Sequence, residues 1–570
     1  MRLKVNKSKN SINYYIITDT KTKDGKRSTK VFKKLGNEQE ILKISNGESP
    51  LEWAKKQVDI VNKQIEEKTL KITAEFSQSN LIEENKQLSF NCGYLFLQDI
   101  YYSLGLDKIC NVISDKYRIK YNLNSILSNL IYTRIIEPSS KLSAFETAKT
   151  FLEQPDFELQ NIYRALGIIA NETEDIESAV YKNSLNVVNR NTKILYYDCT
   201  NYFFEIEEAE GIKQYGKSKE NRPLPIVQMG LFMDGDGFPL AFTINSGNTN
   251  EQVTLKPLEK QIIKDFELSK FVVCTDAGLA SIENRKFNEV QDRSFIVTQS
   301  LKKIKSHLKE WALSKDGWHK LNSKKIINLD NIDNSSSNEE IFYKERWINE
   351  NGLSQRLIVS YSPKYAAYQK AVRTSQVERA QKLINNPSSV SRNRQNDPKR
   401  FIKSTSVTRD GEVADKRVLA LNQSAIDSES AFDGFYAVCT TLEDDISEII
   451  KVNKRRWEIE ESFRILKSDF KARPVYLKRD DRIKAHFTTC FLALLIYRIL
   501  EHKLNGKFTS SQIINTLRNM NLRNLDGVGF IPTYTRTPIT NALHTNFNFR
   551  TDTEITTLKE MKKILNLTKK

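Results

Sequence analysis

The hydrophobic pattern of the first 190 residues changes from strand-like to helical near residue 40. Within residues 1–36, INYYIIT and STKVFKKL predict two strands joined by a turn at Asp24-Gly25. From residue 41 to 190, apolar residues recur at three- and four-residue spacing, as in LEWAKKQVDIVNKQI and LNSILSNLIYTRII. The sequence therefore predicts a small basic β-hairpin module at residues 1–40 and a helical region at residues 41–190.

Short apolar runs rich in β-branched and aromatic residues begin at residue 193. KILYYDC, LPIVQMGLFMD and GFPLAFTIN predict three strands, the last two joined by a Gly-Asp-Gly turn. A helix is expected from about Glu251 to Phe266, and FVVCTD is a further buried strand that ends at Asp276. The order β-β-β-α-β predicts an α/β core with a mixed sheet, whose first part spans residues 191–300.

Residues 301–430 lack this regularity and are expected to form an insertion into the core. EEIFYKERW and QRLIVSYS predict a strand pair there, and YQKAVRTSQVERAQKLI predicts a helix. Residues 385–409 carry six basic residues and one acidic one, which favours an exposed loop along DNA or, equally, a solvated linker. GFYAVCTT and a helix from near Asp444 resume the core over residues 431–505, and residues 506–570 are expected to be helical.

The charge of the chain favours a polyanionic partner. Its 570 residues exceed what one hydrophobic core supports, so several folding units are expected. The 88 Lys and Arg outnumber the 71 Asp and Glu, which gives a formal charge of +17. Such a balance is typical of surfaces that meet phosphate. Coding bias toward Lys is the alternative explanation, so charge alone only favours nucleic-acid binding.

Cysteine and histidine spacing argues against zinc and disulfide frameworks. The six cysteines include no CxxC pair and the five histidines no HxxxH pair. This pattern predicts a reducing compartment. The N-terminus has no apolar signal region, and the longest apolar run, Cys490–Ile496, is far shorter than a membrane span. The chain is therefore expected to be neither exported nor membrane-embedded.

Two aspartates lie where phosphoryl-transfer enzymes place metal ligands. That chemistry uses two divalent ions roughly 3.5–4 Å apart, held by carboxylates from separate elements. Asp198 ends an apolar strand, and Asp276 stands at the carboxyl end of FVVCT before a small Ala277-Gly278 turn. The structural alternatives are a solvent-facing side chain for Asp198 and a helix N-cap for Asp276.

A third acidic candidate, Glu460, lies in the predicted helix that begins near residue 444. Arg456, Glu460 and Lys467 share one face of that helix. An ordinary i,i+4 ion pair between Arg456 and Glu460 would explain the same spacing. Spacing alone also leaves Glu458 and Glu461 open as the acid.

These motifs resemble insertion-sequence transposases of the DDE class, in the subgroup with a Y-x2-R-x3-E-x6-K signature. Arg456, Glu460 and Lys467 match the R, E and K positions, whereas Asn453 stands where the family has Tyr. YYDCTNYFFE, CTDAGLASIEN and RPVYLKRDDRIKAHFTTCFLALLI are similar to the family's first-Asp, second-Asp and downstream segments. The resemblance covers about residues 190–300 and 430–500.

The resemblance implies an RNase H-like core interrupted by a β-rich insertion. It implies that Asp198, Asp276 and Glu460 are the catalytic residues and ligate two Mg²⁺ or Mn²⁺ ions. The implied reaction is cut-and-paste transposition, in which 3′ hydroxyls freed at the transposon ends attack target phosphodiesters. Some relatives cut the second strand through a DNA hairpin with the help of a stacking Trp, for which Trp347 and Trp318 are candidates.

The resemblance also implies contacts with double-stranded DNA, both transposon ends and target. The candidate DNA-binding residues are Arg456, Lys467, Arg464 and Asn453. A homodimer that holds two ends, no membrane association and a bacterial cytoplasmic location at the nucleoid are expected by analogy. The helical region would bind the terminal inverted repeats, where FELQNIYRALGII and TEDIESAVYKNS form either a helix-turn-helix or a simple packing pair.

Three rival functions fit parts of the pattern. A DNA-binding regulator explains the charge but gives no reason for acids at these positions. An RNase H-like nuclease that cuts without joining shares the motifs. An inactive copy of a mobile element is opposed by the presence of all three acids, although Asn453 is a departure from the family signature.

Overall fold

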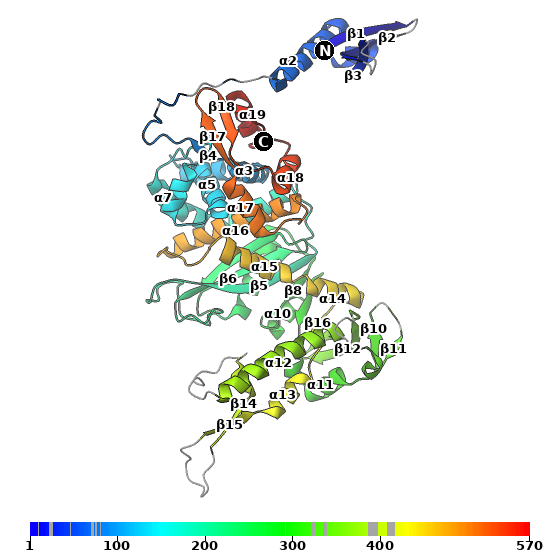
Figure 1. The fold of residues 1–570 in the computed structure, drawn as a ribbon. Helices are drawn as coiled ribbons and strands as arrows, with labels where there is room; N and C mark the ends of the chain where they lie inside the picture. Colours follow the sequence, from blue (N-terminus) through cyan, green and yellow to red (C-terminus); the bar gives the residue numbers. More distant parts are fainter. Residues whose placement is uncertain are drawn as a thin grey trace. The chain divides into compact units, whose positions relative to one another are not determined.

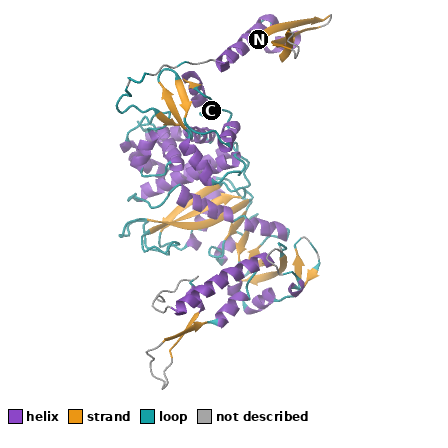
Figure 2. Ribbon diagram, viewed as in Figure 1, coloured by secondary structure: helices purple, strands orange, loops and turns teal. Residues whose placement is uncertain are grey.

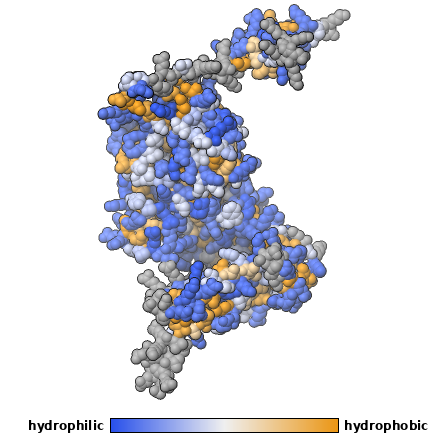
Figure 3. All heavy atoms as spheres, viewed as in Figure 1, coloured by the Kyte–Doolittle hydropathy of each residue, from blue (hydrophilic) through white to orange (hydrophobic). Residues whose placement is uncertain are grey.

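The computed structural model describes residues 1–570 except residues 9–10, 22–26, 46, 70–72, 74–76, 80, 291, 322, 324, 334–338, 386–396 and 407–416. The chain forms two compact units, unit 1 at Met1–Lys86 and unit 2 at Gln87–Lys570. Hydrophilic residues predominate on the visible face of unit 2 (Figure 3). Each unit has its own buried hydrophobic cluster.

Unit 1 contains a three-stranded sheet rather than the two-stranded hairpin that the sequence predicts. Its strands are β1 (Arg2–Ser8), β2 (Ser11–Lys21) and β3 (Arg27–Asn37). They pair antiparallel in the order β1-β2-β3. Strand β1 was not predicted because RLKVNKS has only two apolar residues, Leu3 and Val5. Both of these residues pack against the core of the unit. The predicted turn at Asp24-Gly25 lies outside the described residues.

The predicted helical region at residues 41–190 is divided between the two units. Unit 1 contains α1 (Glu38–Ile44) and α2 (Pro50–Thr69). Unit 2 contains α3 (Tyr94–Ser103), α4 (Leu106–Tyr117), α5 (Leu123–Ile136), α6 (Lys141–Ala148), α7 (Leu159–Asn171) and α8 (Thr173–Ser184). The helices considered for a helix-turn-helix are α7 and α8. Both bury apolar residues in unit 2, which favours a packing pair.

The long helix α16 (Asp480–Lys503) forms the centre of unit 2. It packs against α3, α5 and α7 on one side and against the sheet strand β7 (Pro239–Ser246) on the other. Figure 1 shows it between the helical layer and the sheet. The helix is long and apolar enough to cross a membrane, but 89% of its most apolar window is buried inside the protein. That burial identifies a core helix.

Residues 191–300 form part of a mixed sheet in unit 2, as the sequence predicts. The strands predicted at residues 191–300 are β5 (Ile194–Phe203), β6 (Ile226–Asp234), β7, β8 (Val272–Thr275) and β9 (Ser294–Thr298). They lie in the order β7-β6-β5-β8-β9. Strands β5, β6 and β7 pair antiparallel, whereas β8 runs parallel to both β5 and β9. The crossovers pass through α9 (Leu255–Asp265) and α10 (Ile282–Phe287).

The strands of the segment predicted as an insertion extend this sheet. Its strands are β10 (Trp318–Lys320), β11 (Ile326–Ile327), β12 (Phe342–Glu350) and β13 (Leu353–Tyr361). Strand β13 pairs with β16 (Phe435–Thr440), which pairs with β9, so ten strands form one sheet. The predicted strand pair is confirmed as β12 and β13. The sheet and its flanking helices are distinguished by colour in Figure 2.

Helices and a small hairpin accompany the insertion strands. The helices are α11 (Ser306–Leu313), α12 (Pro363–Asn385), which was predicted, and α13 (Gln423–Ser430). The predicted loop at residues 385–409 lies largely outside the described residues. Its described part is not irregular, because a 3₁₀ turn at Pro398–Phe401 leads into β14 (Ile402–Ser406), which pairs with β15 (Arg417–Leu421).

The C-terminal region, predicted to be helical, contains a sheet as well. It comprises α17 (Ser510–Asn519), β17 (Asn521–Leu525), β18 (Gly529–Pro532), α18 (Pro538–Asn546), β19 (Thr556–Thr557) and α19 (Leu558–Leu567). With β4 (Ser89–Asn91), its strands form an antiparallel sheet in the order β19-β18-β17-β4. The Asp526-Gly527 turn between β17 and β18, with Gly527 at φ +71°, was the signal for a hairpin.

The helix predicted from residue 444 is divided into three segments. They are α14 (Ile446–Lys454), α15 (Trp457–Arg464) and a π-helical turn at Ile465–Asp469. Arg455 and Arg456 form the break between the first two segments. Helix α15 lies along β5 (Figure 1). Because π-helical turns alter the angular spacing of side chains, Lys467 does not follow the regular 3.6-residue spacing that the sequence predicts.

Candidate active site

Asp198 lies on β5, and Asp276 is the residue that directly follows the neighbouring strand β8. The parallel pairing of β5 with β8 matches Tyr196 with Cys274, and each aspartate follows two residues later. The two carboxylates lie within electrostatic range of each other, because the charge of Asp276 contributes to the raised pKa of Asp198. Asp198 lies inside β5, which continues to Phe203, and not at the strand end that the sequence predicts.

Burial and neighbouring charges set the protonation of Asp198. Its neighbours in sequence, Tyr197 and Cys199, are buried on the opposite face of the sheet. Burial raises the pKa of Asp198 to about 6, and the charge of Asp276 adds to that rise, whereas Lys219 and Arg456 oppose it. Asp276, Lys219 and Arg456 therefore all lie within electrostatic range of the Asp198 carboxylate.

Asp276 holds a tight turn and does not cap a helix. Its Oδ1 accepts hydrogen bonds from the backbone N–H groups of Gly278 (2.9 Å) and Leu279 (3.0 Å). Helix α10 begins later, and Ser281 is its N-cap. The Oδ2 atom of Asp276 accepts no hydrogen bond among the described residues, so it remains available to a ligand.

Glu460 is separate from the two aspartates. Its side chain is 64% exposed, and Oε1 lies 3.7 Å from the Arg456 guanidinium. Across the described residues, no three His, Cys, Asp or Glu side chains are placed to hold a metal ion together. The assembled triad that the resemblance implies is therefore not found. The arginine accounts for this placement because it attracts the Glu460 carboxylate.

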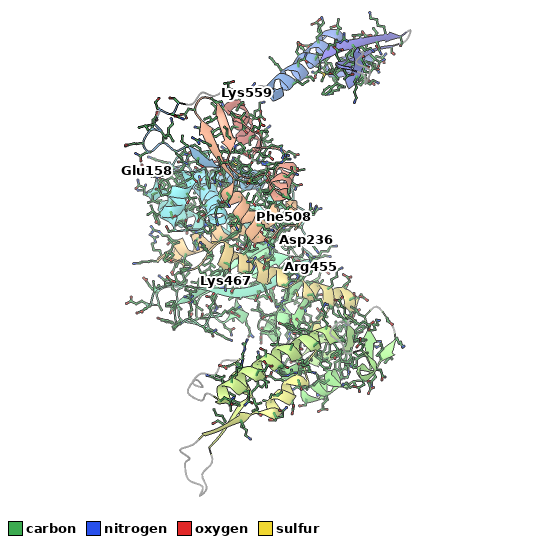
Figure 4. The ribbon with its side chains drawn as sticks, in the orientation of Figure 1. Glu158, Asp236, Arg455, Lys467, Phe508 and Lys559 are labelled. Atoms are coloured by element: carbon green, nitrogen blue, oxygen red, sulfur yellow. The ribbon has the colours of Figure 1, made fainter. Side chains whose placement is uncertain are left out.

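The other two glutamates of α15 face a different part of the molecule. Glu458 pairs with Arg455 at 3.0 Å, and Glu461 pairs with Arg464 at 2.6 Å. Both line a cavity with Asp236, whereas Glu460 lines a separate cavity of about 400 Å³ with Arg456. Figure 4 shows Arg455 and Asp236 apart from Lys467. The geometry therefore favours Glu460 over its neighbours.

A chain of hydrogen bonds holds Arg456 beside the sheet. The Asn453 amide donates to the Tyr436 hydroxyl (3.0 Å), and that hydroxyl shares a hydrogen bond with Thr298 (2.7 Å). Arg456 Nη1 donates to Thr298 Oγ1 at 2.9 Å. Asn453 is buried and supports this chain, and it lines the same cavity as Arg456 and Glu460; its contact with DNA stays a prediction.

Positive side chains surround the Asp198 carboxylate. Lys467 lies 3.8 Å from Glu220 and 5.5 Å from the centre of the Tyr202 ring. Burial lowers the pKa of Lys467 to about 8, while Glu220 and Asp198 oppose that fall. Lys219 donates a hydrogen bond to the Cys199 carbonyl. The ammonium groups of Lys219 and Lys467 thus lie within electrostatic range of Asp198.

Two further sequence candidates are placed differently from expectation. Arg464 forms ion pairs with Glu461 and, at 3.3 Å, with Asp469, and these two carboxylates offset its charge. Trp318 is fully buried, and its indole N–H donates to the Ser314 carbonyl at 2.8 Å. It is a core residue with no free face for a base. Trp347 is 49% exposed on β12 and stays a candidate for stacking.

Lys219 and Tyr436 are site residues that the sequence did not reveal. Lys219 follows a Gly-Lys-Ser run in the loop after β5, and a basic residue in a small-residue loop was the available signal. Tyr436 is an ordinary strand residue in GFYAVCTT, and its role depends on the pairing of β16 with β9. No local pattern identifies it.

The two aspartates fit a hard divalent cation in their chemistry. The Oδ1 atom of Asp198 accepts the Cys199 N–H at 2.7 Å, and its Oδ2 accepts no hydrogen bond among the described residues. Each aspartate thus has one carboxylate oxygen that accepts no hydrogen bond from the described residues. Carboxylate oxygens are the ligands that Mg²⁺ prefers. Asp198 and Asp276 therefore suit two ligand positions, and a third carboxylate would have to come from elsewhere.

An aspartate on β5 and a second one directly after the adjacent strand β8, with Lys219 and Arg456 in electrostatic range, suit phosphate chemistry. The family model described as "Transposase DDE domain" matches residues 202–496, which is more than half of the chain. The chain belongs to this transposase family, and the resemblance to DDE-class transposases is confirmed. The match contains Asp276 and Glu460, whereas Asp198 lies four residues before it.

A solved structure and the curated proteins were also compared with the chain. The structure described as "Cryo-EM structure of piggyBac transposase synaptic complex with hairpin DNA" is 9% identical over 84% of each chain, with a TM-score of 0.35. No curated protein matches the chain.

Proposed function

We propose that this protein is the DNA transposase of an insertion sequence, acting in the bacterial cytoplasm on nucleoid DNA. It would bind terminal inverted repeats, cut the transposon ends and join the freed 3′ hydroxyls to target DNA. The observation that carries the proposal is the proximity of Asp198, on β5, to Asp276, which directly follows the parallel neighbouring strand β8 and whose charge acts on Asp198. Membership in the transposase family supports it.

We interpret the centre of the sheet as an RNase H-like core. The order β7-β6-β5-β8-β9 has the first strand in the middle, two antiparallel strands on one side and two parallel strands on the other. Asp198 lies on β5, and Asp276 directly follows β8, which pairs with β5. Helix α15, which comes after the inserted segment, contacts β5, and this supports Glu460 as the third acid.

Asp198 and Asp276 would hold the divalent ions, with Glu460 as the third carboxylate. Bound Mg²⁺ or Mn²⁺ ions would activate the attacking oxygen and stabilise the leaving oxygen of the phosphodiester. The raised pKa of Asp198 shows that its negative charge is incompletely offset by the protein. A cation at this position would stabilise the ionised carboxylate.

Arg456 and Lys467 would position the DNA phosphate. Both are largely buried cations within electrostatic range of Asp198, so their charges act in a region of reduced dielectric. Charge held there before substrate binds stabilises the negative charge that develops at the phosphate. The hydrogen bond from Arg456 to Thr298 fixes the direction of the guanidinium. Lys219 is a further candidate for this role.

The proposal is tested by cleavage and joining of labelled duplexes that carry the ends of the element. Wild type is compared, with Mg²⁺, with Asp198→Ala, Asp276→Ala and Glu460→Gln, and DNA binding is measured in parallel. We expect each substitution to abolish cutting and joining while binding persists. Cutting without joining in the wild type would favour a nuclease, and binding without cutting would favour a regulator or an inactive copy. An active Glu460→Gln would exclude Glu460 as the third acid.

A further inference from the structure

A cationic pocket outside the proposed active site has no assigned role. It has a volume of about 510 Å³ and lies between the α5–α6 connection and the segment that leads into α16. Seven Arg and Lys residues line it, and no acidic residue does. The exposed Tyr476 also lines it. Such a concentration of positive charge is costly unless a negative partner offsets it.

The deepest charges of the pocket have no carboxylate partner within the described part of the chain. Lys141 is 94% buried, since only 6% of it is exposed, and its Nζ makes no hydrogen bond. Arg134 is also buried and donates only to the backbone carbonyls of Phe470 and Ser139, each at 3.2 Å. Burial and, to a smaller extent, the charge of Arg134 together lower the pKa of Lys141 to about 7. A bound anion would offset the cost of burying the charges of Lys141 and Arg134.

Several buried donors that line the pocket have no hydrogen-bond partner among the residues that the structure describes. They are Arg134 Nε, Ser139 Oγ, Lys141 Nζ and Arg473 Nε. Buried polar atoms in folded proteins are nearly always paired, so a group of orphaned donors lining one cavity indicates a ligand that accepts hydrogen bonds. Helix α6 also begins at this pocket, with Ser140 as its N-cap, and its first backbone N–H groups add positive potential.

We propose that this pocket is a phosphate-binding site that holds one backbone phosphate of bound DNA. A phosphate offers several acceptor oxygens and a negative charge, which match the orphaned donors and the unbalanced cations. The assignment of that phosphate to DNA rests on the proposed function. Its support is proximity to the active site, because Arg473 bonds Glu220 and Glu220 lies 3.8 Å from Lys467.

The rim of the pocket suits a strand that continues from the active site. Lys471 and Lys478 carry charge at its edge, and the ring of Tyr476 is 71% exposed. Arg479, by contrast, is already paired with Asp481 at 2.6 Å. A phosphodiester chain lying over this rim would place one phosphate inward toward Lys141.

The first experiment titrates the full-length protein with inorganic phosphate and follows its Tm, with chloride at matched ionic strength. We expect phosphate at about 100 times Kd to raise the wild-type Tm by about 2–4 °C. Lys141→Met removes the charge but keeps the chain length, and should fold with a Tm at least equal to wild type while losing the phosphate response. Ser139→Ala should weaken the response. Lys149→Met, at the exposed end of the same helix, is the matched control and should keep it.

The second experiment measures the affinity for duplex DNA against salt concentration. Loss of one phosphate contact should reduce the slope of log Kd against log salt by about 0.9 in Lys141→Met, with at least about tenfold weaker binding at low salt. Absence of a phosphate-specific Tm shift in wild type, or its persistence in Lys141→Met, would refute the site. A phosphate response with an unchanged DNA slope would refute DNA as its source. Failure of wild type to bind any DNA would count against the proposed function, while the phosphate titration still decides the pocket.

Discussion

Asp198→Asn should make the protein more stable while it removes catalysis. The substitution keeps the shape of the side chain, and the amide Oδ1 can still accept the hydrogen bond from the Cys199 N–H. What changes is the charge. Burial and Asp276 both disfavour the ionised form of Asp198 in the folded protein, and an amide escapes that penalty.

The size and pH dependence of the effect follow from the pKa of Asp198. Its folded value of about 6 lies above the ordinary 3.8, so between these values the folded protein binds more protons than the unfolded chain. Wild-type stability therefore falls as pH rises through this window. A difference of about 2 pKa units corresponds to about 3 kcal/mol at pH 7 and above, and to almost nothing near pH 3.

The assay is urea denaturation of wild type and Asp198→Asn from about pH 4 to pH 8, with chelator present and no added divalent ion. We expect the advantage of the variant to grow with pH and to level off near pH 7. Added Mg²⁺ should then stabilise wild type more than Asp198→Asn, since ionised Asp198 is a proposed ligand. Equal or lower stability of Asp198→Asn at pH 7 would refute the electrostatic reasoning.

Other substitutions test separate parts of the account. Tyr436→Phe removes the hydroxyl that links Asn453 to Thr298. We expect the rate of single-turnover DNA cleavage to fall about tenfold while folding is unchanged. An unaltered rate would show that this chain of hydrogen bonds does not orient Arg456. Trp318→Ala should lower the free energy of unfolding by about 3–5 kcal/mol in denaturant titration, because the ring is fully buried. Trp347→Ala should change that free energy by less than about 1 kcal/mol, and equal losses in the two variants would contradict the assigned burial.

The mixed sheet was predictable because its strands are short, apolar and bounded by clear turns. KILYYDC and FVVCTD place Asp198 and Asp276 near the ends of buried runs, and an acid in such a run is costly without a partner. Their adjacency depends on the pairing of β5 with β8, which sequence periodicity does not specify. The family resemblance supplied that step.

Features that depend on long-range pairing could not be predicted. The inserted strands join the core sheet because β13 pairs with β16, about 80 residues farther along the chain. Strand β4 pairs with β17 across most of unit 2, so three residues near the start complete a C-terminal sheet. The burial of Trp318 and the exposure of Trp347 likewise depend on which strands and helices cover them. Residue type alone did not separate the two.

The division of the helix that carries Glu460 could not be predicted for a different reason. RRWEIEESFRILK has good helical spacing throughout, yet the backbone breaks at Arg455 and Arg456 and forms a π-helical turn at Ile465–Asp469. Both arginines find partners there, Glu458 for the first and Thr298 for the second. The contact with Thr298 is long-range, whereas the ion pairs of Arg455 with Glu458 and of Arg456 with Glu460 are local i,i+3 and i,i+4 contacts. The second of these is the ion pair that the spacing left open as an alternative.

Metal rescue of cysteine variants tests most directly whether the three acids act together on DNA. Asp198→Cys, Asp276→Cys and Glu460→Cys are each assayed for cleavage and joining of end-bearing DNA in Mg²⁺ and in Mn²⁺. A thiolate is a poor ligand for hard Mg²⁺ and a better one for Mn²⁺. We predict that all three variants are inactive with Mg²⁺ and regain activity with Mn²⁺. A Glu460→Cys variant as active as wild type in Mg²⁺ would contradict the account.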